Sequence, residues 1–160
     1  MMIGLPSFRP LPGLAALAVS VLVLAAAHAS PKGGRDHGGE TLRRPAGTPL
    51  LAVVALAEQR VTIFDADGKI LRAPVSTGQT GYETPAGIYS VIQKEAEHYS
   101  NLYDDAEMPF MQRITWSGIA LHAGVLPGYP ASHGCIRMSS DGAKLFYDTV
   151  KVGTPVTVGD

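Results

Sequence analysis

The chain has 160 residues, of which 13 are Lys or Arg and 14 are Asp or Glu, so its formal net charge at neutral pH is −1. Nucleic-acid binding usually requires a basic face, so this balance argues against a nucleic-acid partner. The length suits one hydrophobic core and is too short for two comfortable domains. The sequence holds a single cysteine, Cys135, so no disulfide can form within the chain.

The N-terminus has the pattern of an export signal. Residues 14–27 form an uncharged apolar run after Arg9, and Ala27-His28-Ala29 fits a signal-peptidase site. The run is shorter than the about 20 residues of a membrane span. We therefore expect residues 1–29 to be a signal peptide, with an uncleaved anchor as the alternative. This predicts an exported protein of the periplasm or cell wall, which meets the membrane only through its signal.

The remaining chain divides into two parts by composition. Residues 30–48 are rich in Gly, Pro and charge and lack apolar periodicity, which predicts a flexible tether. From residue 49 onward the sequence changes to short β-rich segments. Residues 49–160 are therefore predicted to form a single domain.

The β-rich part begins with a predicted hairpin, in which Asp65-Ala66-Asp67-Gly68 is a tight turn between strands at residues 60–64 and 69–75. The other strands are predicted, in chain order, at residues 50–56, 88–92, 111–116, 118–122 and 154–158. Pro and Gly recur between these segments at intervals that favour a β-sandwich or barrel over a βαβ sheet.

Two other segments stand out from the strands. Ser139-Ser140-Asp141 offers N-cap residues for a helix whose apolar positions run from Ala143 to Val150, before Gly153 ends it. The segment from Glu95 to Glu107 is a polar insertion between strands, which we interpret as a surface flap.

An exported thiol without a partner in its own chain is a buried apolar residue, half of an intermolecular disulfide, or a nucleophile. A cysteine nucleophile needs a base and donors for the oxyanion. His133 would face the same side as Cys135 on an extended backbone, and His122 could reach the thiol through the loop at residues 123–131. Either histidine could serve as the base, and Gly134 would allow close approach to a substrate carbonyl.

Two interpretations in which the histidines are not catalytic bases stay open. Each could simply bind a backbone carbonyl. Together with Cys135 they could also supply three zinc ligands, but no fourth ligand suggests itself, and we assign neither a metal nor another cofactor.

The run His122-Ala123-Gly124, followed by Ser132-His133-Gly134-Cys135-Ile136-Arg137-Met138, resembles the signature of the L,D-transpeptidase catalytic domain, the YkuD-type family. Short motifs similar to those of this family also occur in the same order at residues 75–78, 84–89, 116–122 and 153–156, so the resemblance covers most of residues 50–160. The resemblance implies a mainly β, sandwich-like fold with one helix in the C-terminal region. It also implies a cysteine acyltransferase that acts on peptidoglycan.

Residue roles follow from the resemblance by position. Cys135 would be the nucleophile and His122 the general base, with the carbonyl of Ala123 orienting the imidazole. His133, Gly134 and the amide of Cys135 would shape the oxyanion pocket. The activity would then depend on a histidine that titrates near neutral pH.

Four more residues are candidates for contact with substrate. Ser132 would support the oxyanion pocket, and Arg137 would hold a stem carboxylate, with a structural ion pair as the alternative. Tyr129 and Trp116 could offer stacking surfaces, although we favour core packing for Trp116. The nine residues between His122 and Ser132 are fewer than in many family members, which implies a reduced pocket wall.

In this family the thiolate attacks the carbonyl at the L-centre of diaminopimelate in a tetrapeptide stem. The terminal D-Ala leaves, and the amine of another stem resolves the thioester to a 3→3 cross-link that serves cell wall biogenesis and cell shape. The sequence leaves the acceptor open between another stem, a D-amino acid, an envelope protein and water, the last making a carboxypeptidase or amidase. A non-catalytic peptidoglycan-binding module is the competing class. We expect a monomer whose partners are peptidoglycan stem peptides.

Overall fold

The computed structural model describes residues 41–42 and 47–160. Its elements in chain order are β1 (Thr41–Leu42), β2 (Leu51–Ala55), β3 (Arg60–Asp65), β4 (Gly68–Pro74), β5 (Gly87–Ser90), β6 (Gln93–Glu95), β7 (Met111–Arg113), β8 (Ala120–Ala123), β9 (Ile136–Met138), α1 (Ser140–Thr149) and β10 (Pro155–Gly159). In the described part of the chain the fold is thus mainly β with a single helix, as the sequence predicts.

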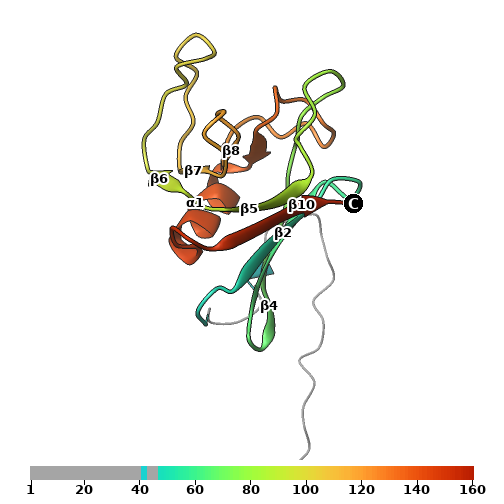
Figure 1. Cartoon of the computed structure of the whole chain (residues 1–160), viewed down its shortest axis with the longest axis vertical. Coiled ribbons are helices and arrows are strands. Elements are labelled where there is room, and N and C mark those ends of the chain that lie inside the picture. Colours follow the sequence, from blue (N-terminus) through green and yellow to red (C-terminus); the bar gives the residue numbers. More distant parts are fainter. Residues whose placement is uncertain (1–40, 43–46) are drawn as a thin grey trace, which may run out of the picture. The chain divides into compact units, whose positions relative to one another are not determined.

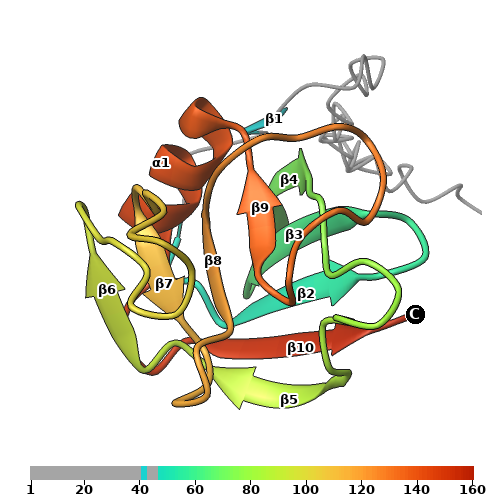
Figure 2. The same ribbon diagram turned by 90° about the horizontal axis from the view of Figure 1, so that it is seen from above.

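The strands form two sheets (Figures 1 and 2). The larger has the order β1-β4-β3-β2-β10-β5, in which β10 runs parallel to β2 and every other pair is antiparallel. The smaller has the order β6-β7-β8-β9, with β8 and β9 parallel. Figure 2 shows α1 beside this smaller sheet, and the helix contacts β7, β8 and β9.

One apolar cluster joins both sheets and the helix. Alternate residues of β2 and β3 are buried, as expected for strands with one face on a core. Leu121, Ile136 and Met138 supply the inward face of the smaller sheet, and Phe146 of α1 is fully buried against the same cluster. The opposite face of the smaller sheet carries a second, smaller apolar cluster of Met111 and Ala120 with Met108, against which Cys135 packs.

The predicted hairpin and helix are confirmed. Asp65 Oδ1 accepts from the N–H of Asp67 at 2.9 Å in the turn between β3 and β4, and Gly68 takes φ +118° there. Ser139 is the N-cap of α1, and its side chain accepts from the N–H of Gly142 at 3.1 Å. The strand predicted at residues 111–116 is shorter, because Thr115 Oγ1 accepts from the N–H of Ile119 and turns the chain after Arg113.

Two expectations need correction. Trp116 is 78% exposed rather than packed in the core, because it stands in the tight turn between β7 and β8. Thr41 and Leu42, within the predicted tether, form β1 and pair with β4. The rest of the tether up to residue 40, residues 43–46 and the predicted signal peptide lie outside the described residues. No helix in the described ranges is long and apolar enough to cross a membrane.

Candidate active site

The register of the smaller sheet brings the candidate residues to one face. His122 on β8 is paired with Arg137 on β9, and Cys135 lies two residues before Arg137. Residues two apart on a strand point to the same side, and so do paired residues on neighbouring strands. His122, Cys135 and Arg137 therefore project from the same face, opposite the one that packs on the core.

A tight turn presents Cys135. Ser132 is buried, its hydroxyl donates to the carbonyl of Cys135 at 2.5 Å, and it accepts from the N–H of Gly134 at 3.1 Å. Gly134 has φ +108°, a conformation that residues with a side chain rarely adopt. The hydroxyl of Thr84 donates to the Gly134 carbonyl at 2.8 Å. These bonds fix the backbone that carries the thiol.

The same bonds decide which amides in the turn are free. The N–H of Gly134 is already donated to Ser132, whereas the N–H of Cys135 makes no hydrogen bond within the described ranges. Of the groups that the sequence assigns to an oxyanion pocket, the Cys135 amide is thus the backbone donor that remains available.

His122 is held in one tautomer. It is 7% exposed, and its Nδ1 lies 2.7 Å from the carbonyl oxygen of Ala123. A carbonyl only accepts, so Nδ1 carries the proton and Nε2 is left with a lone pair. Burial lowers the pKa of His122 to about 4, against the opposing effect of the Ala123 bond, and the charges of Arg137 and His98 lower it further. The expectation of a histidine titrating near neutrality is therefore corrected.

Cys135 is a neutral thiol in this environment. Burial raises its pKa, although a hydrogen bond from the Ala120 backbone and the charges of Arg137 and Arg113 oppose this. Its Sγ makes a weak contact with the carbonyl of Gly118 at 3.5 Å. A neutral thiol beside a neutral imidazole suits general-base activation better than a resting thiolate–imidazolium pair.

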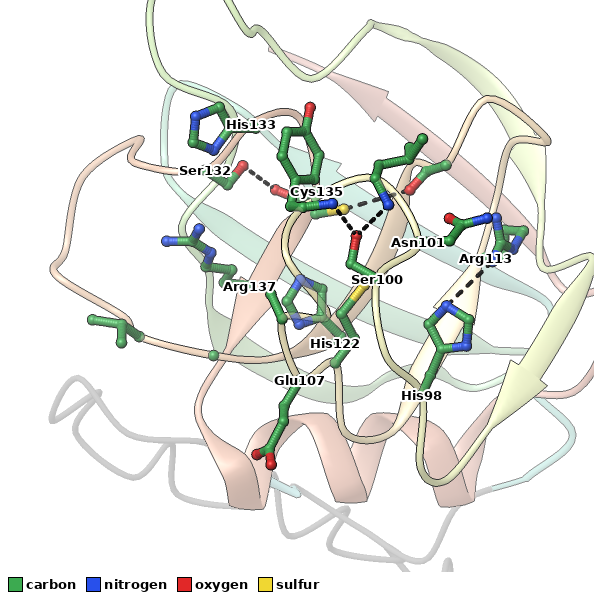
Figure 3. Close-up of a pocket in the computed structure, with 17 residues that line it drawn as sticks. His98, Ser100, Asn101, Glu107, Arg113, His122, Ser132, His133, Cys135 and Arg137 are labelled. Carbon is green, nitrogen blue, oxygen red and sulfur yellow. Dashed lines mark hydrogen bonds between the residues drawn. The ribbon is translucent and has the colours of Figure 1, made fainter.

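These groups line one cavity of about 310 Å³, shown in Figure 3. Cys135, His122, Ser132, His133 and Arg137 all contribute to its wall. The predicted flap at residues 95–107 supplies another part of the wall, through His98, Ser100, Asn101, Leu102, Tyr103, Ala106 and Glu107. The interpretation of this insertion is therefore extended, because it lies at the candidate site.

His133 connects the turn at residues 132–135 to the flap. Its exposed ring makes an edge contact with Tyr82, with ring centroids 4.6 Å apart, and a tilted contact with Tyr103 of the flap at 5.0 Å. His133 thus has aromatic partners, and it is His122 that has the buried, oriented imidazole expected of a base.

Two further candidates differ in their surroundings. Arg137 donates a long hydrogen bond to the carbonyl of Ala131 at 3.4 Å and has no carboxylate within salt-bridge distance in the described ranges. Tyr129 is 61% exposed and does not line the cavity, and its carbonyl accepts from Ser76 at 2.6 Å. Among the described residues, no cluster of His, Cys, Asp or Glu has the arrangement of a metal site.

The sequence analysis missed Arg113 and His98, which also line the cavity. The alternation of the predicted strand at residues 111–116 could have placed Arg113 on one face. Only the pairing of Arg113 with Ala120 shows that this is the face of His122.

Comparison with protein families agrees with this arrangement. The YkuD family model, described as the L,D-transpeptidase catalytic domain, matches residues 49–158, which include every residue of the cavity wall. The chain belongs to this family. L,D-transpeptidase 1 of Mycobacterium tuberculosis is 30% identical over 129 residues, covering 70% of this chain and 51% of the relative. Probable L,D-transpeptidase 3 of the same organism is 32% identical over 111 residues, covering 59% and 40%.

Solved structures of L,D-transpeptidases share the fold. One from Mycobacterium smegmatis has a TM-score of 0.63 at 26% identity, covering 68% of this chain and 58% of the other. L,D-transpeptidase 3 from Mycobacterium tuberculosis, solved with a faropenem-derived adduct, has a TM-score of 0.63 at 26% identity, covering 70% and 61%. The chain spans about half the length of the curated relatives that it matches.

Proposed function

We propose that the protein is an L,D-transpeptidase, a cysteine acyltransferase that acts on peptidoglycan stem peptides. The observation that carries this proposal is the hydrogen bond between His122 Nδ1 and the Ala123 carbonyl. It leaves Nε2 as an unprotonated base in the same cavity as the Cys135 thiol. Membership of the L,D-transpeptidase family supports the same reaction.

In the first half-reaction, His122 Nε2 takes the thiol proton as Cys135 Sγ bonds to the carbonyl carbon of the diamino acid in the stem. The free N–H of Cys135 donates to the oxyanion that forms on this carbonyl. The tetrahedral intermediate then breaks its bond to the D-Ala nitrogen, which receives the proton from His122. This leaves a thioester on Cys135 and a free D-Ala.

In the second half-reaction, an acceptor amine attacks the thioester and passes its proton to His122. The bond to Sγ breaks, and the thiol regains a proton. When the amine belongs to another stem, the product is a 3→3 cross-link; a D-amino acid or an envelope protein would use the same acyl-enzyme. Arg137 is placed in this scheme as a partner for a stem carboxylate, since it lacks one among the described residues.

Export to the periplasm or cell wall is part of the proposal, because the substrate lies outside the cytoplasm. The sequence of residues 1–29 supports it through its signal-peptide pattern.

The test is acylation of the purified protein followed by mass spectrometry. A penem or carbapenem serves as the probe, since a relative carries a faropenem-derived adduct. We expect one covalent adduct on the wild type and none on Cys135→Ala. Digested sacculi rich in tetrapeptide stems should then yield 3→3 linked dimers with the wild type alone. Folded wild-type protein that forms no adduct would favour a peptidoglycan-binding module, and free tripeptides without dimers would favour hydrolysis.

A further inference from the structure

The cavity contains two guanidinium groups and no carboxylate paired with either. Arg137 and Arg113 both line it, and neither forms an ion pair within the described ranges. Glu107 also contributes to the wall, but Figure 3 shows its carboxylate directed away from Cys135. The part of the cavity around the thiol thus carries an excess of positive charge, which favours an anionic ligand.

Arg113 stands level with the nucleophile across the sheet. It is paired with Ala120, and the pairing of Leu121 with Ile136 sets Ala120 level with Cys135 on the other side. Two strand spacings, about 10 Å, therefore separate the backbones of Arg113 and Cys135, and both side chains rise from the same face. A long guanidinium side chain can span much of that distance. A substrate whose carbonyl lies at Sγ would bring its neighbouring groups within reach of Arg113.

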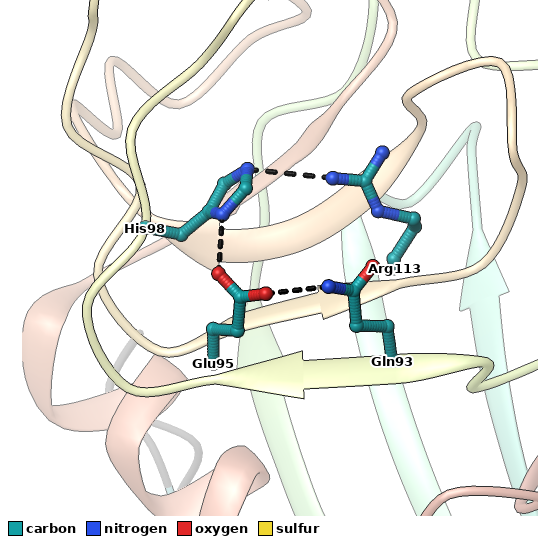
Figure 4. A network of polar contacts seen from close by, with 4 residues as sticks. All are labelled: Gln93, Glu95, His98 and Arg113. Atoms are coloured by element: carbon teal, nitrogen blue, oxygen red, sulfur yellow. Dashed lines mark hydrogen bonds and ion pairs between the residues drawn. The ribbon is translucent and has the colours of Figure 1, made fainter.

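A network of polar contacts holds Arg113 in place, as Figure 4 shows. Its Nη2 donates to His98 Nε2 at 3.4 Å, and His98 Nδ1 donates to Glu95 Oε2 at 2.6 Å. Gln93 Nε2 donates to the other oxygen of that carboxylate at 2.5 Å. The base of the flap thus orients the guanidinium through the His98 ring, and no carboxylate of the described residues forms an ion pair with it.

The hydrogen-bonding capacity of Arg113 is not used up by this network. Its Nε is buried and has no hydrogen-bond partner among residues 41–42 and 47–160. A buried N–H of a charged group that lacks a protein partner is costly, so a ligand that supplies an acceptor gains free energy there. A carboxylate matches the fork of a guanidinium better than any neutral acceptor does.

We propose that Arg113 is a specificity-determining residue, which binds a free carboxylate of the acyl-donor stem. The carboxylate comes from one of two places, the far end of the diamino acid side chain or the terminal D-Ala. A donor with an amide at that position loses the charge-assisted bond. This inference rests on the proposed transpeptidase function and deepens it, because it names the form of the stem that the enzyme prefers.

The test compares three synthetic stem tetrapeptides. One has both carboxylates free, one is amidated on the diamino acid side chain, and one is amidated on the terminal D-Ala. For each, kcat/KM is measured by mass spectrometry as exchange of the terminal D-Ala for another D-amino acid. For the wild type, kcat/KM should be about tenfold to a hundredfold lower with one of the amidated donors, which is the size expected for the loss of a charged hydrogen bond. The position of the amide in that donor identifies the carboxylate that Arg113 binds.

The variants separate recognition from folding. In Arg113→Gln the ratio of kcat/KM between the parent and that amidated donor should fall to about one, whereas Arg113→Lys, which keeps the charge without the fork, should retain part of it. Arg60→Gln removes the same charge from β3 in the other sheet and should keep the wild-type ratio. If Arg113 had a merely structural role, its substitution would lower kcat/KM for all three donors by the same factor. The ratio of kcat/KM between donors, rather than any single rate, therefore distinguishes recognition from structure.

Two results would overturn the inference. Wild type that processes all three donors equally, or Arg113→Gln that keeps the wild-type ratio, removes Arg113 from recognition while leaving the transpeptidase function intact. If Arg113→Gln fails to fold, Arg113→Lys carries the same comparison, and an unchanged ratio there has the same meaning. Wild type that turns over no donor refutes the proposed function itself, and the inference with it.

Discussion

The buried hydroxyl of Ser132 and the backbone of Cys135 form one unit. Ser132 Oγ donates to the Cys135 carbonyl at 2.5 Å and accepts from the N–H of Gly134 at 3.1 Å, so one side chain bonds to the backbone before and after the Cα of Cys135. The hydroxyl bonds to the backbone of the turn rather than to the Cys135 thiol. Ser132 is therefore a positioning residue for the thiol and for the Cys135 amide.

Ser132→Ala should lower both stability and acylation. Loss of the hydroxyl removes a hydrogen-bond partner from the Cys135 carbonyl and from the Gly134 N–H, which lowers the free energy of unfolding by about 1–3 kcal/mol. We expect the rate of acylation by a carbapenem to fall about tenfold, because the turn that aims Sγ and the Cys135 N–H is loosened. Urea unfolding and stopped-flow acylation measure the two effects. Ser140→Ala, at an exposed position in α1, is the matched control and should change neither.

The pH dependence of acylation follows from a neutral Cys–His pair. Because burial lowers the pKa of His122 to about 4, the imidazole stays an available base down to mildly acidic pH. The acylation rate should therefore remain nearly constant from about pH 7 to about pH 5 and fall only as His122 becomes protonated. If the rate instead fell by half near pH 6.5, the pKa of His122 would be that of an ordinary imidazole. This would contradict the lowering of its pKa by burial.

The same shift makes stability depend on pH. His122 has a lower pKa folded than unfolded, so the unfolded state binds more protons between pH 6.5 and about 4. Its contribution is fully present above pH 6.5 and is lost as pH falls through this window, by about 3 kcal/mol in total. Urea unfolding of the wild type at several pH values measures the loss. His122→Gln cannot be protonated, so its free energy of unfolding should decline less over the same window.

Gly134→Ala should disable the site through the backbone. At φ +108° a side chain is strained, and an added Cβ would lie 2.8 Å from Ile119 Cδ1. We expect a loss of about 1–3 kcal/mol in stability together with a large fall in acylation, since relief of the strain rotates the amide of Cys135. Thermal unfolding and adduct formation test this. Gly159→Ala, where an added Cβ meets nothing within 4 Å, should leave both unchanged.

The sequence predicts local features well, because their causes are local. The hairpin at Asp65–Gly68 follows from turn residues between alternating strands, and the helix start at Ser139 follows from its cap. The turn that carries Cys135 is predictable for the same reason, since Ser132, Gly134 and Cys135 are close in sequence. Each of these elements is specified by residues that touch one another along the chain.

Features that depend on pairing across the sheet are not predictable in this way. Arg113 joins the site only through its register with Ala120, and the flap reaches the cavity only by folding back over it. The low pKa of His122 comes from burial, which no local pattern reports. The misplacement of Trp116 has a similar origin, because β7 ends at Arg113 and the tryptophan falls in a turn instead of a strand.

Tyr103 provides a test of the flap as a wall of the site. Its ring packs on His133 at 5.0 Å, and it is held near Ser100, whose hydroxyl accepts from the Tyr103 N–H at 3.1 Å. Tyr103→Ala removes the ring contact, worth about 0.5–1.5 kcal/mol for aromatic pairs, and should let the flap open more often. We expect Cys135 to react several-fold faster with a bulky thiol reagent, while KM for a stem donor rises.

The matched control for this variant is Tyr99→Ala, which removes an exposed flap tyrosine that does not line the catalytic cavity. It should leave the rate of thiol labelling unchanged. Because Tyr103 is itself 45% exposed, its removal has little effect on the core, and the melting temperature should fall by only a few degrees. If labelling of Cys135 were equally fast in the wild type and Tyr103→Ala, the flap would not restrict access to the thiol.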